Sequence, residues 1–206
     1  MSTIEATSTT VKVRADLLAR AVSNATLFAS KDRMRPVLTM AHLFADNGKV
    51  CVETTDSYVA YRETVAETEA PEGFSVLVEV AELAPIVKAC KAFAAGMVSM
   101  ETDGQSVRFD VYSSSFTVRD TTTLFDFPRT DTFFDQFTVG TEPIAHIGFG
   151  AQVLARLAKV DPDGRKSAAK TGHALKIEVQ NELKPARVSW PMNDGIRAVV
   201  MPVRIS

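Results

Sequence analysis

Apolar and polar positions follow the same order three times along this chain. Residues 11–13 alternate like a short strand, and apolar side chains then recur at helical spacing from Asp16, a potential helix cap, to Ser30. Three strand-like runs follow, separated by the turn-forming pairs Asn47-Gly48 and Asp56-Ser57. The pattern predicts one strand, one helix and three further strands, at residues 37–45, 50–55 and 59–64.

The same order recurs twice with different residues. The second stretch predicts a strand at 74–78, a helix at 80–93 and strands at 97–101, 107–112 and 116–120. The third predicts a strand at 144–148, a helix at 152–160 and strands at 175–179, 186–190 and 196–203. The chain is therefore expected to be an α+β protein of repeated β-α-β-β-β units with antiparallel sheets.

Domain boundaries follow from this repeat. Residues 1–10 are small and polar and are expected to form a disordered tail. Residues 11–125 hold two units and form one complete domain, whereas residues 144–206 hold one unit and form half a domain. Between them, residues 126–143 are rich in phenylalanine around Pro128, and so many aromatic residues favour a linker that packs across a junction.

Composition narrows the class of protein. The chain has 206 residues, of which 46% are hydrophobic and 23% charged, as in ordinary soluble proteins. No apolar run is long enough to span a bilayer, and the first residues do not resemble a signal peptide. Cys51 and Cys90 sit among apolar neighbours, which is typical of buried free thiols. We therefore expect a cytoplasmic protein without contact to membranes.

Positive charge is unevenly distributed. Residues 1–150 carry 13 Lys and Arg against 20 Asp and Glu, whereas residues 151–206 carry 10 against 5. The outward faces of the three predicted helices are cationic or small, and carboxylates are scarce on them, with Glu82 the main exception. Such faces are typical of a solvated surface or of a surface that contacts phosphates. Their cations are Arg20, Lys88, Lys91, Arg156 and Lys159.

Enzymatic chemistry finds little support. His42, His146 and His173 show no metal-ligand spacing with either cysteine. Residues 161–164 look like the start of a calcium loop but lack the glutamate that should follow, and residues 164–167 lack the upstream glycine of a phosphate-binding loop. We expect no catalytic residue, no cofactor and no metal.

At this point the chain resembles DNA sliding clamps, specifically the bacterial DNA polymerase III beta subunit family. Ser30-Lys31-Asp32, Arg35-Pro36-Val37-Leu38 and Thr54-Thr55-Asp56-Ser57-Tyr58 resemble family motifs, as do Asp126-Phe127-Pro128 and Ile147-Gly148-Phe149. The final run, residues 199–205, is similar to the family's Val-Val-Met-Pro-Met-Arg-Leu terminus. Residues 11–125 resemble the middle domain of a clamp and residues 144–206 the second half of its last domain. A shortened clamp of this kind is typical of a phage or another mobile element.

The resemblance implies a DNA-clamp fold in which helices line a concave inner face. It implies a homo-oligomeric ring that encircles double-stranded DNA without reading sequence, served by a clamp loader, and a processivity role for a DNA polymerase. The implied DNA-binding residues are Arg20, Lys88, Lys91, Arg156 and Lys159, together with Arg165 and Lys166 of the loop 161–172. The alternative for this loop is that its charges only keep it soluble. Lys31, Arg33 and Arg35 are weaker candidates.

The resemblance also implies a cleft for peptides of the Gln-Leu-x-Leu-Phe type, carried by the polymerase and other partner proteins. Its residues are Thr55, Ser57, Tyr58, Val59, Ala60, Met201, Pro202, Val203, Arg204 and Ile205. The alternative for Met201 and Val203 is an ordinary place in the core. The alternative for the whole protein is a clamp-like module that does not encircle DNA but binds such peptides or modulates a host clamp.

Overall fold

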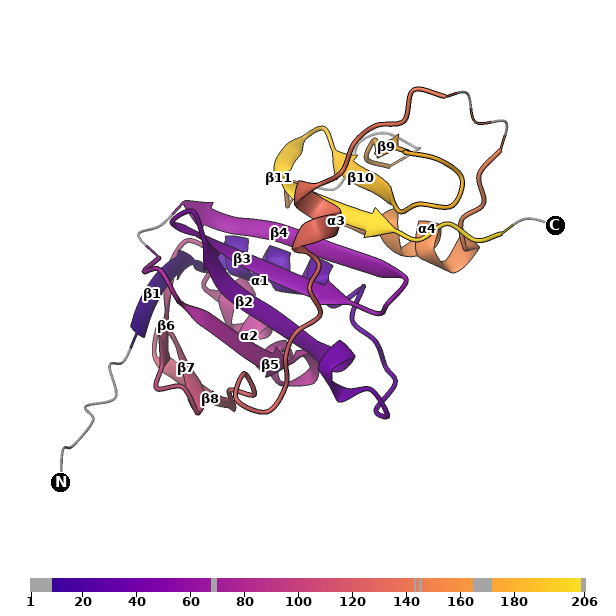
Figure 1. Ribbon diagram of the computed structural model, residues 1–206. Helices are drawn as coiled ribbons and strands as arrows, with labels where there is room; N and C mark the ends of the chain where they lie inside the picture. The colour runs from indigo at the N-terminus through magenta and orange to yellow at the C-terminus, as the bar shows by residue number, and fades with distance from the viewer. Residues whose placement is uncertain (1–8, 68–69, 143, 145, 165–171, 205–206) are drawn as a thin grey trace.

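The computed structural model describes residues 9–67, 70–142, 144, 146–164 and 172–204, and Figure 1 shows an α+β arrangement of two sheets and a few helices. The first unit comprises β1 (Thr9–Arg14), α1 (Ala15–Ala25), β2 (Met40–Asp46), β3 (Lys49–Thr55) and β4 (Val59–Glu67). The second comprises β5 (Ser75–Glu79), α2 (Val80–Ala92), β6 (Met97–Thr102), β7 (Ser106–Val111) and β8 (Ser114–Arg119). The predicted order of elements in both units is confirmed.

Three local details differ from expectation. β1 begins at Thr9, inside the stretch expected to be a disordered tail, because it pairs with β6. α1 ends at Ala25 rather than at Ser30, and Asp16 lies in its first turn rather than at its cap. The start of the strand expected at 37–45 is instead a 3₁₀ turn, Pro36–Thr39, since Pro36 has a fixed φ and no N–H to donate to a sheet.

The two units exchange their first strands. β1 of the first unit pairs with β6 of the second, giving the sheet β1-β6-β7-β8, and β5 of the second pairs with β2 of the first. All of these pairings are antiparallel. Each sheet therefore contains strands from both units, and neither unit has a complete sheet by itself.

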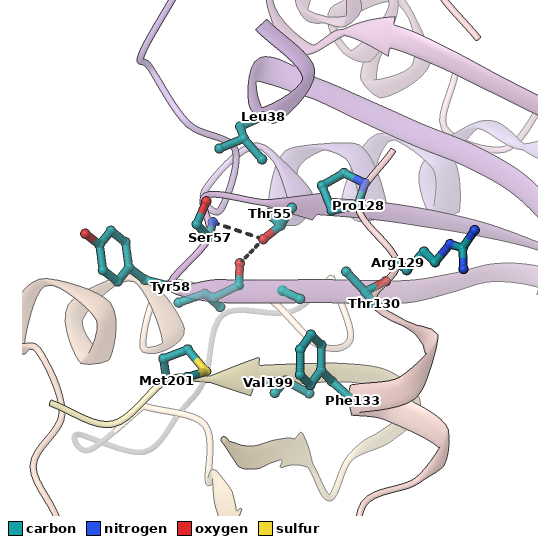
Figure 2. Close-up of a pocket in the computed structure, with 12 residues that line it drawn as sticks. Leu38, Thr55, Ser57, Tyr58, Pro128, Arg129, Thr130, Phe133, Val199 and Met201 are labelled. Atoms are coloured by element: carbon teal, nitrogen blue, oxygen red, sulfur yellow. Dashed lines mark hydrogen bonds between the residues drawn. The ribbon is translucent and has the colours of Figure 1, made fainter. Parts of the chain in front are cut away.

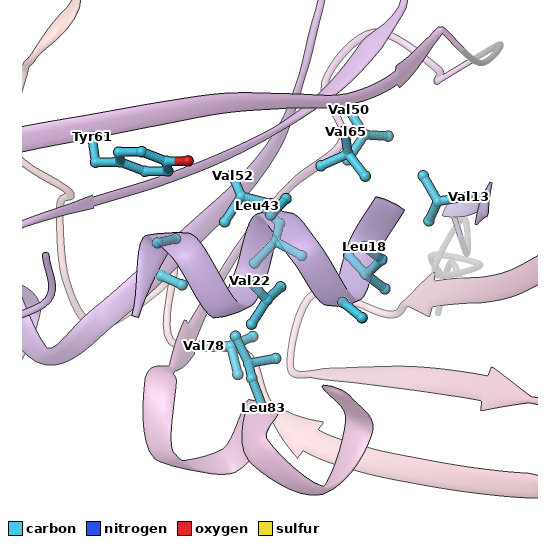
Figure 3. Close-up of a cluster of buried hydrophobic side chains, with 14 of the residues drawn as sticks. Val13, Leu18, Val22, Leu43, Val50, Val52, Tyr61, Val65, Val78 and Leu83 are labelled. Carbon is cyan, nitrogen blue, oxygen red and sulfur yellow. The ribbon is translucent and has the colours of Figure 1, made fainter. Parts of the chain in front are cut away.

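A single core joins the helices to both sheets. Figure 3 shows Leu18 and Val22 of α1 between Leu83 of α2 and the valines of the neighbouring strands. These side chains are at most 3% exposed. Burial of each such side chain contributes about 1.5–3 kcal/mol, so this interior fixes where α1 and α2 lie.

The third unit extends the sheet that contains β5, β2, β3 and β4, at the edge formed by β4. It comprises α4 (Ala151–Leu157), β9 (Lys176–Glu178), β10 (Ala186–Trp190) and β11 (Asn193–Val200). β11 pairs antiparallel with β4, so the sheet runs β5-β2-β3-β4-β11-β10-β9. The strand expected at 144–148 is wrong for the described residues of that range, where only Gly148 forms an isolated bridge, to Val203.

Helices lie on both sides of this seven-stranded sheet. Neighbouring residues of a strand face opposite sides: Tyr61 packs on Phe28 and Trp190 in the main core, whereas Ala60 forms a separate cluster with Phe134. Phe134 belongs to α3 (Asp131–Asp135), a short helix of the linker that the pattern did not predict. α1 and α3 therefore cover opposite faces, as Figure 1 shows.

No helix within the described ranges has the length and apolar character needed to cross a membrane.

Candidate functional site

A mostly apolar pocket lies where β4, β11 and the linker meet (Figure 2). Its volume is about 220 Å³. It is lined by Leu38, Thr55, Ser57, Tyr58, Val59, Ala60, Pro128, Arg129, Thr130, Phe133, Val199 and Met201. We call this the cleft. Its lining comes from four separate segments of the chain, so it exists only in the folded protein.

The first wall is the tight turn between β3 and β4. The Asp56 carboxylate accepts the N–H groups of Tyr58 and Val59, both at 2.9 Å, and the Thr55 hydroxyl donates to the carbonyl of Val59 at 2.8 Å. Ser57 has a φ of +78°, a conformation that glycine adopts more readily than serine. The turn is therefore held by hydrogen bonds even though it has no glycine.

The floor of the cleft is the junction of β4 and β11. Val59 and Ala60 lie opposite Val200 and Val199 in the antiparallel register. Beyond the strand, the Met201 N–H donates to the carbonyl of Tyr58 at 2.9 Å, and the Val203 N–H donates to that of Gly148 at 2.9 Å. These bonds keep the C-terminal segment beside the turn, with the Met201 side chain 40% exposed at the edge of the cleft.

The second wall is the linker, which the ion pair between Arg62 and Glu53 holds in place. The Thr130 hydroxyl donates to the Glu53 carboxylate, and Arg62 pairs with Glu53 at 2.8 Å and with Asp131 at 2.5 Å. The Arg62 guanidinium also lies 4.6 Å from the Phe134 ring centroid. Burial raises the pKa of the Glu53 carboxyl, against the opposing charge of Arg62. These contacts fix the start of α3, from which Phe133 reaches the cleft, 45% exposed.

His42 connects the linker to β2. Its ring stacks on Phe44 at 4.5 Å and contacts Phe127 of the linker at 5.2 Å, and its Nε2 is 2.9 Å from the Ser75 hydroxyl. Burial and the positive charge of Arg62 lower the pKa of His42 to about 4. The imidazole is therefore neutral at physiological pH.

This shift predicts a dependence of stability on pH. Because the pKa is lower in the folded than in the unfolded chain, the stabilisation by neutral His42 is full above about pH 6.5 and is lost as pH falls toward 4. The loss between pH 7.5 and pH 5 amounts to about 2 kcal/mol. Urea unfolding of the wild type and of His42→Gln at both pH values measures it. Equal pH dependence in the two proteins would contradict the assignment.

Comparison with known proteins identifies the family. Residues 9–131 match the model of the family "DNA polymerase III beta subunit, N-terminal domain", which is more than half of the chain. The chain belongs to this family. The matching model is that of the N-terminal domain rather than of the middle domain that the motifs had indicated. No curated protein sequence matches the chain.

Solved beta subunits share the fold. The Thermotoga maritima DNA polymerase III beta subunit superposes with a TM-score of 0.75 at 11% identity, over 96% of this chain and 66% of that one. The Pseudomonas aeruginosa subunit gives 0.71 at 13% identity, over 95% and 66%. The Caulobacter crescentus sliding clamp gives 0.73 at 15%, over 100% and 68%. The chain thus spans about two thirds of the length of these solved proteins.

Only some of the residues expected in the peptide cleft of this family line the cleft described above. Thr55, Ser57, Tyr58, Val59, Ala60 and Met201 all line the cleft. Val203 and Arg204 line a separate recess with His146 and Leu183, Pro202 lines neither, and Ile205 is outside the described residues. The alternative of a core position does not hold for Met201 and Val203, which are 40% and 46% exposed.

Sequence reasoning missed half of the lining residues of the cleft. They come from the 3₁₀ turn, from the linker and from the end of β11, and are Leu38, Pro128, Arg129, Thr130, Phe133 and Val199. The phenylalanine-rich linker around Pro128 was the signal that indicated part of this wall. Nothing in the local pattern distinguishes Val199 from its neighbours in β11.

The cations expected to contact DNA in a clamp also divide into groups. Lys88, Lys91 and Lys159 are exposed. Arg20 pairs with the buried Glu63 at 2.9 Å, and Arg156 pairs with Asp56 at 2.6 Å. Arg165 and Lys166 lie outside the described residues. The two paired arginines are engaged within the chain, so the three exposed lysines remain the stronger candidates.

One grouping of potential metal ligands was not indicated by spacing. Ligand atoms of Asp161, Asp163 and His173 lie within 4.8 Å of one another, and all three residues are half-buried. One Asp161 oxygen already accepts the N–H groups of Asp163 and Gly164. His173 lies ten residues after Asp163, a spacing that the sequence pattern did not single out.

Proposed function

We propose that this protein is a sliding-clamp processivity factor. In this proposal it forms a homo-oligomeric ring around duplex DNA in the cytoplasm, is placed there by a clamp loader, and tethers a DNA polymerase through the cleft. It performs no covalent chemistry. Membership of the beta-subunit family and the apolar cleft between β4, β11 and the linker support it, and the cleft is the observation that carries it.

The cleft suits a short peptide with apolar side chains. Leu38, Val199 and Phe133 supply apolar walls, and the flexible Met201 side chain adapts to the shape of an occupant. Thr55, Ser57 and Thr130 place polar groups around it. A mostly apolar pocket with few polar groups is typical of peptide recognition by apolar anchor residues.

Contact with DNA is assigned to the exposed lysines of the helices. Lys88 and Lys91 both extend from α2 and are exposed. Ammonium groups that meet phosphates bind without regard to sequence, and their binding weakens as salt rises. We therefore expect Lys88→Ala/Lys91→Ala to weaken DNA binding and to reduce its dependence on salt.

Peptide binding is tested by fluorescence polarisation with a labelled peptide that contains Gln-Leu-Asp-Leu-Phe. Phe133→Ala and Met201→Ala are each expected to weaken binding about tenfold, since each removes an apolar wall. Tyr112→Ala is the matched control, because Tyr112 is also an exposed aromatic residue, 79% exposed directly after β7, and it does not line the cleft. Failure of the wild type to bind the peptide would contradict the proposal.

Encirclement is tested on circular DNA. Clamps loaded on a nicked circle should remain bound and should dissociate when the circle is linearised. Equal retention on circular and linear DNA contradicts a ring. Sedimentation then separates the alternatives: a discrete oligomer supports the ring, and a strict monomer that still binds the peptide favours the module that does not encircle DNA.

A further inference from the structure

Another recess, distinct from the one lined by Val203 and Arg204, lies directly beside the cleft. It has a volume of about 510 Å³ and is bounded by the end of α1, the segment after it, the β3–β4 turn and α4. Tyr58 lines both the cleft and this recess, and is 63% exposed between them. A chain that leaves the cleft past Tyr58 therefore enters the recess.

The recess is strongly basic. Lys31, Arg35, Arg156 and Lys159 line it, and Asp56 is the sole carboxylate among its lining residues. These four cations come from two segments of the chain, residues 31–35 and 156–159, so the fold brings the two pairs together.

Two of the cations are already engaged. Arg156 donates to Asp56 at 2.6 Å and to the carbonyl of Leu27 at 3.4 Å, and its guanidinium lies 5.7 Å from the Phe28 ring centroid. Arg35 donates to Asp32 at 3.1 Å and to the Ser57 hydroxyl at 3.3 Å. These contacts hold both guanidinium groups against the turn.

The two lysines differ from the arginines. Within the described ranges no carboxylate forms an ion pair with Lys31 or Lys159, and both are exposed at the recess. The recess thus offers two unpaired ammonium groups beside a cleft that is itself mostly apolar. Its charge is complementary to carboxylates next to a set of apolar anchors.

We propose that this recess selects partner peptides in which acidic residues flank the apolar anchors. The inference rests on the proposed function of the cleft and adds a determinant of partner choice. Anchors occupy the cleft, and a flanking Asp or Glu places its carboxylate between Lys31 and Lys159. Charges at the rim of an interface mainly raise the association rate and distinguish between partners, and salt screens them.

A duplex is the competing occupant of a basic recess, because phosphates also bind lysine. Continuity with the cleft through Tyr58 favours the peptide. The assignment also gives Lys159 a role different from the DNA contact expected from its helix position. DNA binding is therefore measured in the same experiment.

The test uses two labelled peptides with one Gln-Leu-Asp-Leu-Phe core, extended at both ends by Asp-Asp in one and by Asn-Asn in the other. The wild type is expected to bind the Asp peptide about fivefold more tightly at low salt, and this preference should shrink at high salt. In Lys31→Glu/Lys159→Glu the preference should vanish or reverse. Lys88→Glu/Lys91→Glu, an equal charge reversal on α2, should retain it.

The outcomes that contradict the inference can be distinguished from those that contradict the proposed function of the cleft. Equal affinity of the wild type for both peptides overturns the inference and leaves the cleft intact. Absence of binding to either peptide overturns the proposed cleft itself. If Lys31→Glu/Lys159→Glu keeps the preference but loses more DNA affinity than Lys88→Glu/Lys91→Glu, the recess belongs to DNA and the inference fails.

Discussion

Replacing Arg62 by alanine is expected to lower the free energy of unfolding by about 3 kcal/mol. The Arg62 side chain is 12% exposed and that of its partner Glu53 is 2% exposed. Without the guanidinium, Glu53 keeps only the Thr130 hydroxyl among the side-chain partners described above. A buried carboxylate that loses its counter-ion is far costlier than an exposed one.

The loss should depend on pH in a defined direction. Burial already raises the pKa of Glu53 in the folded chain, and removal of Arg62 raises it further. A carboxyl with a raised folded pKa contributes stability below its unfolded pKa, and this contribution is lost as pH rises through the folded value. The cost of Arg62→Ala should therefore be greatest at neutral pH and smaller toward pH 4.5.

The same substitution should weaken peptide binding about tenfold, because Arg62 anchors the linker wall of the cleft through Asp131 and Phe134. Denaturant unfolding at two pH values and fluorescence polarisation measure the two effects. Arg108→Ala is the control: Arg108 also pairs with two carboxylates on a strand, but it is 53% exposed and should contribute less than about 1 kcal/mol. Similar costs for both variants would refute the argument.

Replacing Arg20 by leucine in the otherwise unchanged chain is also expected to lower the free energy of unfolding by about 3 kcal/mol. Arg20 is 15% exposed and pairs with Glu63, whose side chain is fully buried. Glu63 also accepts hydrogen bonds from the Tyr61 hydroxyl at 2.6 Å and from Asn24 at 3.0 Å. Asn24 in turn donates to the carbonyl of Asp161 at 2.8 Å and accepts its N–H at 3.0 Å, which connects α1 to the third unit.

A double variant separates charge from packing. In Arg20→Leu/Glu63→Gln the amide still accepts from Tyr61, and no buried charge remains, so about half of the lost stability should return. The single tryptophan of the chain, Trp190, is 1% exposed and reports unfolding by fluorescence. A double variant less stable than Arg20→Leu would show that the charge of Glu63 is not the cause. Lys88→Leu, on an exposed helix face, should change stability by less than about 0.5 kcal/mol.

Most elements of the fold were predictable because each has its own period. The alternation of β7 and the helical spacing of α2 are properties of neighbouring residues, and burial on one face follows from them. The exchange of β1 and β5 between units was not predictable in this way. Pairing of Thr9 with Thr102 depends on residues far apart, and nothing in the local pattern distinguishes it from pairing within a unit.

The turn of the cleft was found through family motifs, and the wall made by α3 was not. α3 has five residues, which is too short for a periodic signal. Its position depends on Arg62, which lies far away in sequence on β4. The cations of the helices show the same limit of prediction from local sequence. Arg20 and Arg156 lie on the outward faces of their helices by spacing, but Glu63 and Asp56 approach them from other elements.

The strand exchange has a consequence for how the chain folds during synthesis. β1 leaves the ribosome long before β6, its only neighbour in the described sheet, so it must wait with unpaired backbone groups until most of the domain has been made. Pairing between such distant segments has a high contact order and makes folding slow. Nascent chains that stop before Met97 should therefore depend on chaperones and aggregate when these are depleted.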